Sequence, residues 1–187
     1  MKTFFLTIIF FASMRSQSQG VFRNQTSSAL EKVVQDYTNQ FKNIKGELLS
    51  SREGVAEYKS TIVIPGATAS TVTQTVVANK QSSDWQSVLF TGSNFEQAKT
   101  HFEEFFDQIK NTIIRPAGQK AVIVNGTYIA PIANHSFTTI QFDMLPPNAV
   151  LQNLHIDLSL KNTNGNWNIL LNVYDKERPV QENMVVK

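Results

Sequence analysis

Two segments of the chain, residues 28–49 and 93–114, place apolar residues at every third or fourth position, which predicts two amphipathic helices. The first stripe consists of Leu30, Val33, Tyr37, Phe41, Ile44 and Leu48. The second is nearly all aromatic and consists of Phe95, Phe102, Phe105, Phe106, Ile109 and Ile113. Pro116 and Gly118 follow it as stop signals. A phenylalanine stripe at helical spacing is typical of a buried core face, so we do not interpret it as a cofactor site.

The two predicted helices resemble each other in sequence at an offset of 65 positions. Ser28 aligns with Ser93, and Phe41 aligns with Phe106. Each segment begins with Ser-x-x-Glu, which predicts a capping box that satisfies free backbone donors of the first turn. The repeat predicts a body made of two related α+β units, at residues 28–92 and 93–175.

Sequence with β character follows each predicted helix. The predicted strands lie at residues 57–64, 71–78 and 85–91 after the first helix, and at 120–129, 136–144, 153–161 and 167–174 after the second. The last two are the clearest because apolar and polar residues alternate along them, as expected of a strand with one buried face. Residues 162–166 (Asn-Thr-Asn-Gly-Asn) predict a hairpin between these two strands.

This order of elements predicts an α+β fold in which an antiparallel sheet carries both amphipathic helices on one face. The alternative is a single cone-like sheet wrapped around one helix, with the first helix as an extra layer. Asn125-Gly126 also allows two interpretations, a tight hairpin turn or a bulge within one strand, and the repeat favours the bulge. We expect residues 20–175 to form a single domain and residues 176–187, which lack periodicity, to form a loose tail.

Residues 1–19 have the pattern of a secretory signal peptide. Lys2 precedes an apolar run at residues 4–12, and a short polar stretch with small residues follows. The run is too short to cross a bilayer, which takes roughly 20 apolar residues. No second run of this kind occurs, so we expect a secreted or periplasmic protein with no membrane span in the mature chain.

Composition narrows the classes of function. The chain has 17 Lys and Arg residues against 15 Asp and Glu, and Lys2 and Arg15 belong to the predicted leader, so the mature chain is close to neutral. Near-neutral charge without a basic run argues against a nucleic-acid partner. The absence of cysteine excludes disulfides, thiol catalysis and Cys-ligated zinc, and together with export it favours a bacterial envelope. Asn-x-Ser/Thr triplets at Asn24, Asn125 and Asn134 are then best interpreted as chance rather than as glycan acceptors.

Few residues have a pattern that suggests chemistry. His155 and Asp157 lie two positions apart on a predicted strand, so both point to its polar face, where they could start an acid/base or metal site. The alternative is a solvated sheet face. Asp143, near the preceding strand, could approach them if the register permits. Trp85 and Trp167 each open a predicted strand, where a tryptophan can stack on a ligand or cap the core. No motif for a metal, a cofactor or a nucleophile occurs, so none is predicted.

These observations favour a non-enzymatic binding or interaction module of the envelope, with a protein, a small molecule or a glycan as its partner. The recognition surface would be the open sheet face or the seam between the halves. One alternative is a small hydrolase-like or isomerase-like enzyme that uses His155 and Asp157. Another is a carrier of small apolar ligands with a cavity lined by the second helix. Residues 68–83, polar and prone to β structure, could form an exposed edge strand that recruits a partner strand.

Overall fold

The computed structural model describes residues 24–176, which form a mixed α+β fold. The predicted signal peptide at residues 1–19 lies outside the described residues, as does all of the predicted tail except Lys176. The helices are α1 (Gln25–Gln35) and α2 (Phe95–Ile109), with short 3-10 turns η1 (Tyr37–Asn39), η2 (Lys42–Ile44) and η3 (Ala149–Leu151). The strands are β1 (Lys45–Arg52), β2 (Val55–Ser60), β3 (Ala69–Val77), β4 (Lys80–Gly92), β5 (Ile113–Ile114), β6 (Val122–Asn125), β7 (Phe137–Leu145), β8 (Leu154–Thr163) and β9 (Asn166–Asp175).

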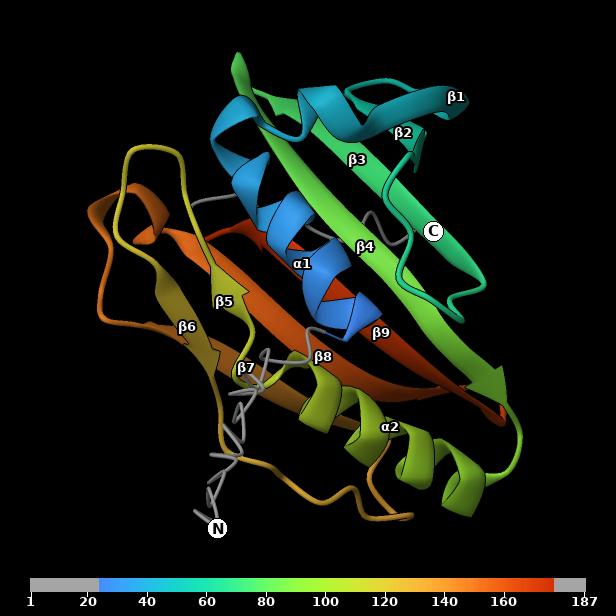
Figure 1. The fold of residues 1–187 in the computed structure, drawn as a ribbon. Helices are drawn as coiled ribbons and strands as arrows, with labels where there is room; N and C mark the ends of the chain where they lie inside the picture. The colour runs from blue at the N-terminus through green and yellow to red at the C-terminus, as the bar shows by residue number, and fades with distance from the viewer. Residues whose placement is uncertain (1–23, 177–187) are drawn as a thin grey trace, which may run out of the picture.

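Within residues 24–176 the nine strands form one sheet in the order β1-β2-β3-β4-β9-β8-β7-β6-β5, and every neighbouring pair is antiparallel (Figure 1). The antiparallel α+β prediction is therefore confirmed. The prediction of an exposed edge strand at residues 68–83 is wrong, because β3 lies between β2 and β4. Since β1 and β5 were not predicted as strands, the sequence pattern did not identify the two edges of this sheet.

The sheet has one buried face, which follows from the alternation in β8 and β9. Leu158 lies opposite Ile140 on β7 and Leu171 on β9, and all three side chains are buried. Burying an aliphatic side chain of this size contributes about 1.5–3 kcal/mol. Trp85 on β4 joins this face fully buried, and its Nε1 donates a hydrogen bond to Ser60 Oγ at 3.0 Å.

Helix α2 packs on this buried face through its aromatic side chains. Phe95 lies 4.9 Å from Trp167 between ring centroids, and Phe106 stacks on Phe142 at 5.8 Å. Helix α1 contacts α2 and β5, and its apolar residues belong to the same core (Figure 1). The prediction that the phenylalanine stripe of the second helix is a core face is confirmed for Phe102 and Phe106, which are buried.

Asparagine residues begin both helices. The Asn24 side chain accepts a hydrogen bond from the Ser27 amide at 2.6 Å, and Asn94 caps α2 in the same way. An asparagine cap satisfies a free backbone donor as a serine would. The predicted capping box of Ser28 and Glu31 is therefore wrong, since Ser28 lies inside α1 and Glu31 is buried. The equivalent prediction for α2 is also wrong, because Ser93 lies before the Asn94 cap.

Helix α1 ends at Gln35, well before the predicted end at residue 49, and Asp36 explains why. This carboxylate is buried and accepts hydrogen bonds, at 2.6 to 3.2 Å, from the Asn39 and Asn43 side chains and from the Asn43 and Ile44 amides. Gln40 and Phe41 adopt left-handed backbone angles, with φ of 57° and 56°, which reverse the chain. The residues after this turn form β1 instead of continuing the helix.

Asn125-Gly126 is neither a hairpin turn nor a bulge. Strand β6 pairs with β7 without a register shift and ends at Asn125. A Cβ atom on Gly126 would lie 2.7 Å from Cδ1 of Phe142, which is too close for a side chain. Glycine is required here because the chain passes directly over the Phe142 ring.

Candidate functional site

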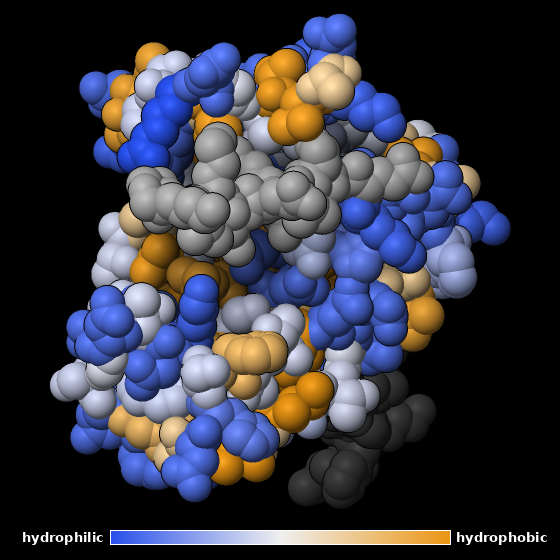
Figure 2. All heavy atoms as spheres, turned by 180° about the vertical axis from the view of Figure 1, so that it is seen from behind, coloured by the Kyte–Doolittle hydropathy of each residue, from blue (hydrophilic) through white to orange (hydrophobic). Residues whose placement is uncertain are grey.

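The side of the sheet opposite α2 carries the polar half of the strand alternation. We call it the polar face and define it by Gln86, Gln141, His155, Asp157, Asn172 and Tyr174. The register brings these side chains from four strands together, because Asp157 lies opposite both Gln141 and Asn172. Figure 2 views the molecule from behind, where hydrophilic side chains prevail and smaller hydrophobic patches lie between them.

His155 and Asp157 lie on this face, as the strand period predicted, and Tyr174 connects them. The Tyr174 hydroxyl donates a hydrogen bond to Asp157 Oδ2 at 2.5 Å. The His155 ring stacks on the Tyr174 ring with centroids 5.5 Å apart, and its Nδ1 is hydrogen-bonded to the Gln141 amide group. Within the described chain no hydrogen bond joins His155 to Asp157. The two residues are therefore members of one polar cluster and are linked through Tyr174 rather than by a direct hydrogen bond.

The second carboxylate oxygen of Asp157 is unusual for this face. Oδ1 is buried and has no hydrogen-bond partner among residues 24–176. Leaving a buried acceptor unsatisfied costs about 1–3 kcal/mol.

A cavity lies at one end of the polar face, where β7 changes partner. The ladder between β7 and β8 ends at the pair Phe142–Ile156, and the next residues of β7, from Asp143 to Leu145, pair with β6. Residues 146–153 connect the two strands beside this point. The resulting cavity has a volume of about 640 Å³, and we call it the β7–β8 cavity.

The lining of the β7–β8 cavity is mixed. Its polar residues are Gln141, Asp143, Asn148, Gln152, His155 and Lys176. Its apolar residues include Met144, Leu145, Pro147, Leu151 and Leu154. The cavity and the polar face share Gln141 and His155, so they form one continuous site. Asp143, a candidate from the sequence, therefore lies in the same site as His155.

The two tryptophans lie elsewhere. Trp85 is fully buried on the opposite side of the sheet, and Trp167 is 6 % exposed and packs on Phe95. Both occupy the core, which was the second of the two sequence-based interpretations. Sequence reasoning missed Tyr174 and Lys176. Tyr174 shares the alternation of β9, but only the register with β8 places it beside His155.

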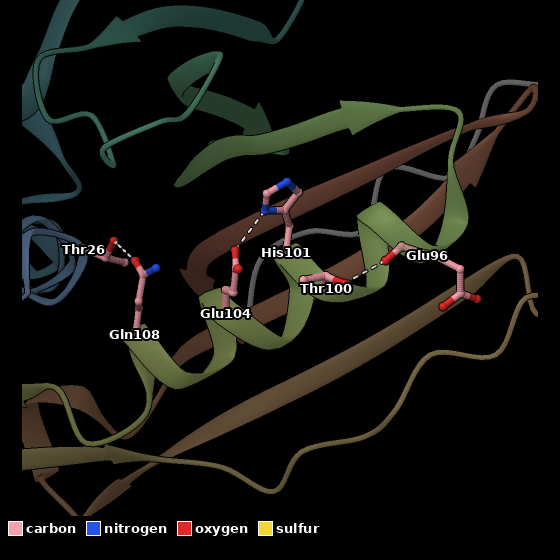
Figure 3. A network of polar contacts seen from close by, with 6 residues as sticks. All are labelled: Thr26, Glu96, Thr100, His101, Glu104 and Gln108. Carbon is pink, nitrogen blue, oxygen red and sulfur yellow. Dashed lines mark hydrogen bonds and ion pairs between the residues drawn. The ribbon is translucent and has the colours of Figure 1, made fainter.

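The histidine of α2 makes a local contact (Figure 3). His101 Nδ1 lies 2.9 Å from Glu104 Oε2 on the same helix, and the imidazole ring lies 4.9 Å from the Phe90 ring. Farther along α2, Gln108 accepts a hydrogen bond from Thr26 of α1 at 2.6 Å (Figure 3). The Thr26–Gln108 hydrogen bond joins α1 to α2, and the Phe90–His101 ring contact joins α2 to β4, whereas the His101–Glu104 contact stays within α2.

Tyr128 lies beside α2, and the structure raises the pKa of its phenol. Burial raises the pKa of its phenol above the ordinary value of about 10, and the nearby carboxylates of Glu103 and Asp107 raise it further. The hydroxyl is buried without a hydrogen-bond partner in the described residues, and the ring lies 5.2 Å from the Phe106 ring. Since Phe106 belongs to the core, Tyr128 lies apart from the polar face.

No protein-family model matches the chain, and neither a curated protein nor a solved structure is significantly similar to it. Among residues 24–176, no group of three or more His, Asp or Glu side chains is arranged to hold a metal ion. Neither helix of the described chain has the length and apolar character needed to cross a membrane.

Proposed function

We propose that this protein is a non-enzymatic binding module, secreted or periplasmic in a bacterium, which holds its ligand with the polar face and the β7–β8 cavity. The observation that carries the proposal is the cavity at the end of the polar face, lined by His155, Asp143 and Gln141. Its volume of about 640 Å³ lies within the range of about 300–1,000 Å³ in which proteins bind small molecules. The predicted leader supports the extracytoplasmic location.

The hydrogen-bonding character of the polar face supports a polar ligand. Its cross-strand pairs include Gln86 Nε2 with Asn172 Oδ1 at 2.8 Å and Thr139 with Ser159 at 3.0 Å. Amide and hydroxyl groups both donate and accept hydrogen bonds, so they can adapt to a bound partner. A nucleic acid has no support, because the mature chain is nearly neutral and lacks a basic run.

The two alternatives have less support. An enzyme that uses His155 and Asp157 as a hydrogen-bonded pair has less support, because the two residues bond to Gln141 and Tyr174 instead. A carrier would hold its ligand in a cavity lined by the phenylalanines of α2. The β7–β8 cavity is lined by no residue of that helix.

We also propose that the scaffold is a pseudo-repeat with both helices on the buried face. Each helix is followed by an antiparallel meander, β1 to β4 after α1 and β5 to β9 after α2. The second meander contains one more strand, and the polar face draws most of its residues from that half.

A two-dimensional NMR screen tests the binding proposal. The labelled protein is titrated with a small-molecule fragment library and with neutral oligosaccharides. We expect amide shifts at residues 141–157 and 172–176. His155→Ala should reduce them, while the matched variant His101→Ala, which alters an imidazole on α2, should leave them unchanged. Ligands that shift only α1, α2 or β1 would contradict the proposal, and turnover in a hydrolase screen that His155→Ala abolishes would favour the enzyme.

A further inference from the structure

We propose that the β7–β8 cavity binds a small zwitterion with an apolar side chain, such as a free amino acid or a dipeptide. The ammonium group would lie toward Asp143 and the carboxylate toward Lys176. This inference rests on the proposed binding function and specifies the class of ligand. Three properties of the cavity carry it: its charges, its backbone edges and its apolar lining.

The charges of the cavity come from Asp143 and Lys176 and are of opposite sign. Asp143 and Lys176 line the same cavity, and within residues 24–176 neither forms an ion pair. A ligand with a single charge would complement one of them and oppose the other. A zwitterion can complement both, and such matching of charge is how a binding site selects among ligands of similar size.

The backbone at the cavity can also take part in binding. Because the β7–β8 ladder ends at Phe142–Ile156, the edges of β7 and β8 that face each other beyond this pair are not joined by ladder hydrogen bonds. Main-chain N–H and C=O groups are obligatory hydrogen-bonding groups. They match the amide, ammonium and carboxylate groups of an amino acid or a dipeptide, as in peptides that add to an open strand edge.

The apolar lining of the cavity is the reason to expect an apolar side chain on the ligand. Leu151 and Leu154 are buried at 4 % and 7 % exposure, whereas Leu145 is 46 % exposed. An apolar side chain placed against Leu145 would remove that surface from water, which is favourable in proportion to the area covered. A sugar has neither the charges nor the apolar chain, and is therefore the weaker candidate for this end of the site.

Isothermal titration of the full mature chain with four probes tests the inference. The probes are leucyl-leucine, its N-acetyl derivative without the ammonium, its amide without the carboxylate, and glycyl-glycine without the side chains. We expect leucyl-leucine to bind and each of the other three to bind at least about tenfold more weakly, which corresponds to one lost charge-assisted or apolar contact.

Matched variants assign each charge of the ligand to a residue. Asp143→Asn should remove the preference for leucyl-leucine over its N-acetyl derivative, and Lys176→Gln should remove the preference over the amide. Lys161→Gln, an exposed lysine of β8 outside the cavity, is the control and should change neither preference.

The possible failures can be told apart. Equal affinity for leucyl-leucine and its N-acetyl derivative would overturn the inference. Absence of leucyl-leucine binding at about 10 mM, a concentration that detects interactions in the weak millimolar range, would overturn it as well. Either result leaves the proposed function intact if the NMR screen still finds ligands at residues 141–157. The proposed function fails if no ligand in that screen shifts this region, or if a hydrolase screen finds turnover that His155→Ala abolishes.

Discussion

Tyr128 shows how a single side chain can couple this fold to pH. Its ring is partly buried against Phe102 and Phe106 of α2, and its phenol lies close to Glu103 and Asp107. Desolvation disfavours the phenolate, and the two carboxylates repel it, so the pKa in the folded state is higher than in the unfolded state. The native structure therefore keeps this proton at a pH where the unfolded chain releases it.

We expect the free energy of unfolding to fall above about pH 10, partly because of this residue, since the unfolded state then binds fewer protons than the native state. Below that pH both states are protonated, and the contribution of Tyr128 does not change. Tyr128→Phe should lose less stability between about pH 8 and pH 11 than the parent protein. Urea unfolding at the two pH values measures the difference, and equal losses in the two proteins would show that Tyr128 is not coupled to folding.

At the scale of elements, the connection from α1 to β1 depends on Asp36. Both oxygens of this buried carboxylate accept hydrogen bonds, Oδ1 from two side-chain amides and Oδ2 from the Asn43 and Ile44 amides. Its removal would leave four donors without their acceptor and would free the left-handed turn at Gln40 and Phe41.

We therefore expect Asp36→Ala to lower the free energy of unfolding by about 2–4 kcal/mol. Asp36→Asn should also destabilise, because its NH₂ group would face two donors. Asp107→Ala replaces an exposed aspartate of α2 and should stay within about 0.5 kcal/mol of the parent protein. Chemical denaturation measures all three, and a small effect of Asp36→Ala would mean that the turn forms without its carboxylate.

The same elements show what the sequence could and could not predict. The β8–β9 hairpin was predictable because its signals are local: alternation along both strands and a turn at Asn164-Gly165, where φ is 52° and 83°. The end of α1 was not predictable. The helical spacing continues through Tyr37, Phe41 and Ile44, while the chain is turned by hydrogen bonds to Asp36 that leave no periodic pattern.

The candidate site was likewise predictable from the sequence only in part. The period of β8 predicts that His155 and Asp157 share a face. Tyr174 beside them depends on the register between β8 and β9, and the cavity depends on β7 leaving β8 for β6 after Phe142. Register and partner choice are set by contacts between segments distant in the chain, which a single sequence does not reveal.

At the scale of the whole molecule, the pairing of β4 with β9 is the ladder that joins the chain before α2 to the chain after it. Trp85 on β4 lies opposite Val173 on β9, and both are buried. Helix α1, from the first half, packs against α2 and β5 of the second. The two meanders therefore share one core.

This shared core predicts that the halves do not fold alone. Expressed separately, residues 24–92 would expose the edge of β4 and the buried face around Trp85, and residues 93–176 would lack α1 and β4. We expect neither fragment to show a cooperative thermal transition by circular dichroism, and we expect the two fragments to copurify and regain a transition when they are coexpressed. Residues 24–176 as one chain are the control. A cooperative transition in residues 93–176 alone would mean that the second half carries its own core, and that the first half was added to an already stable body.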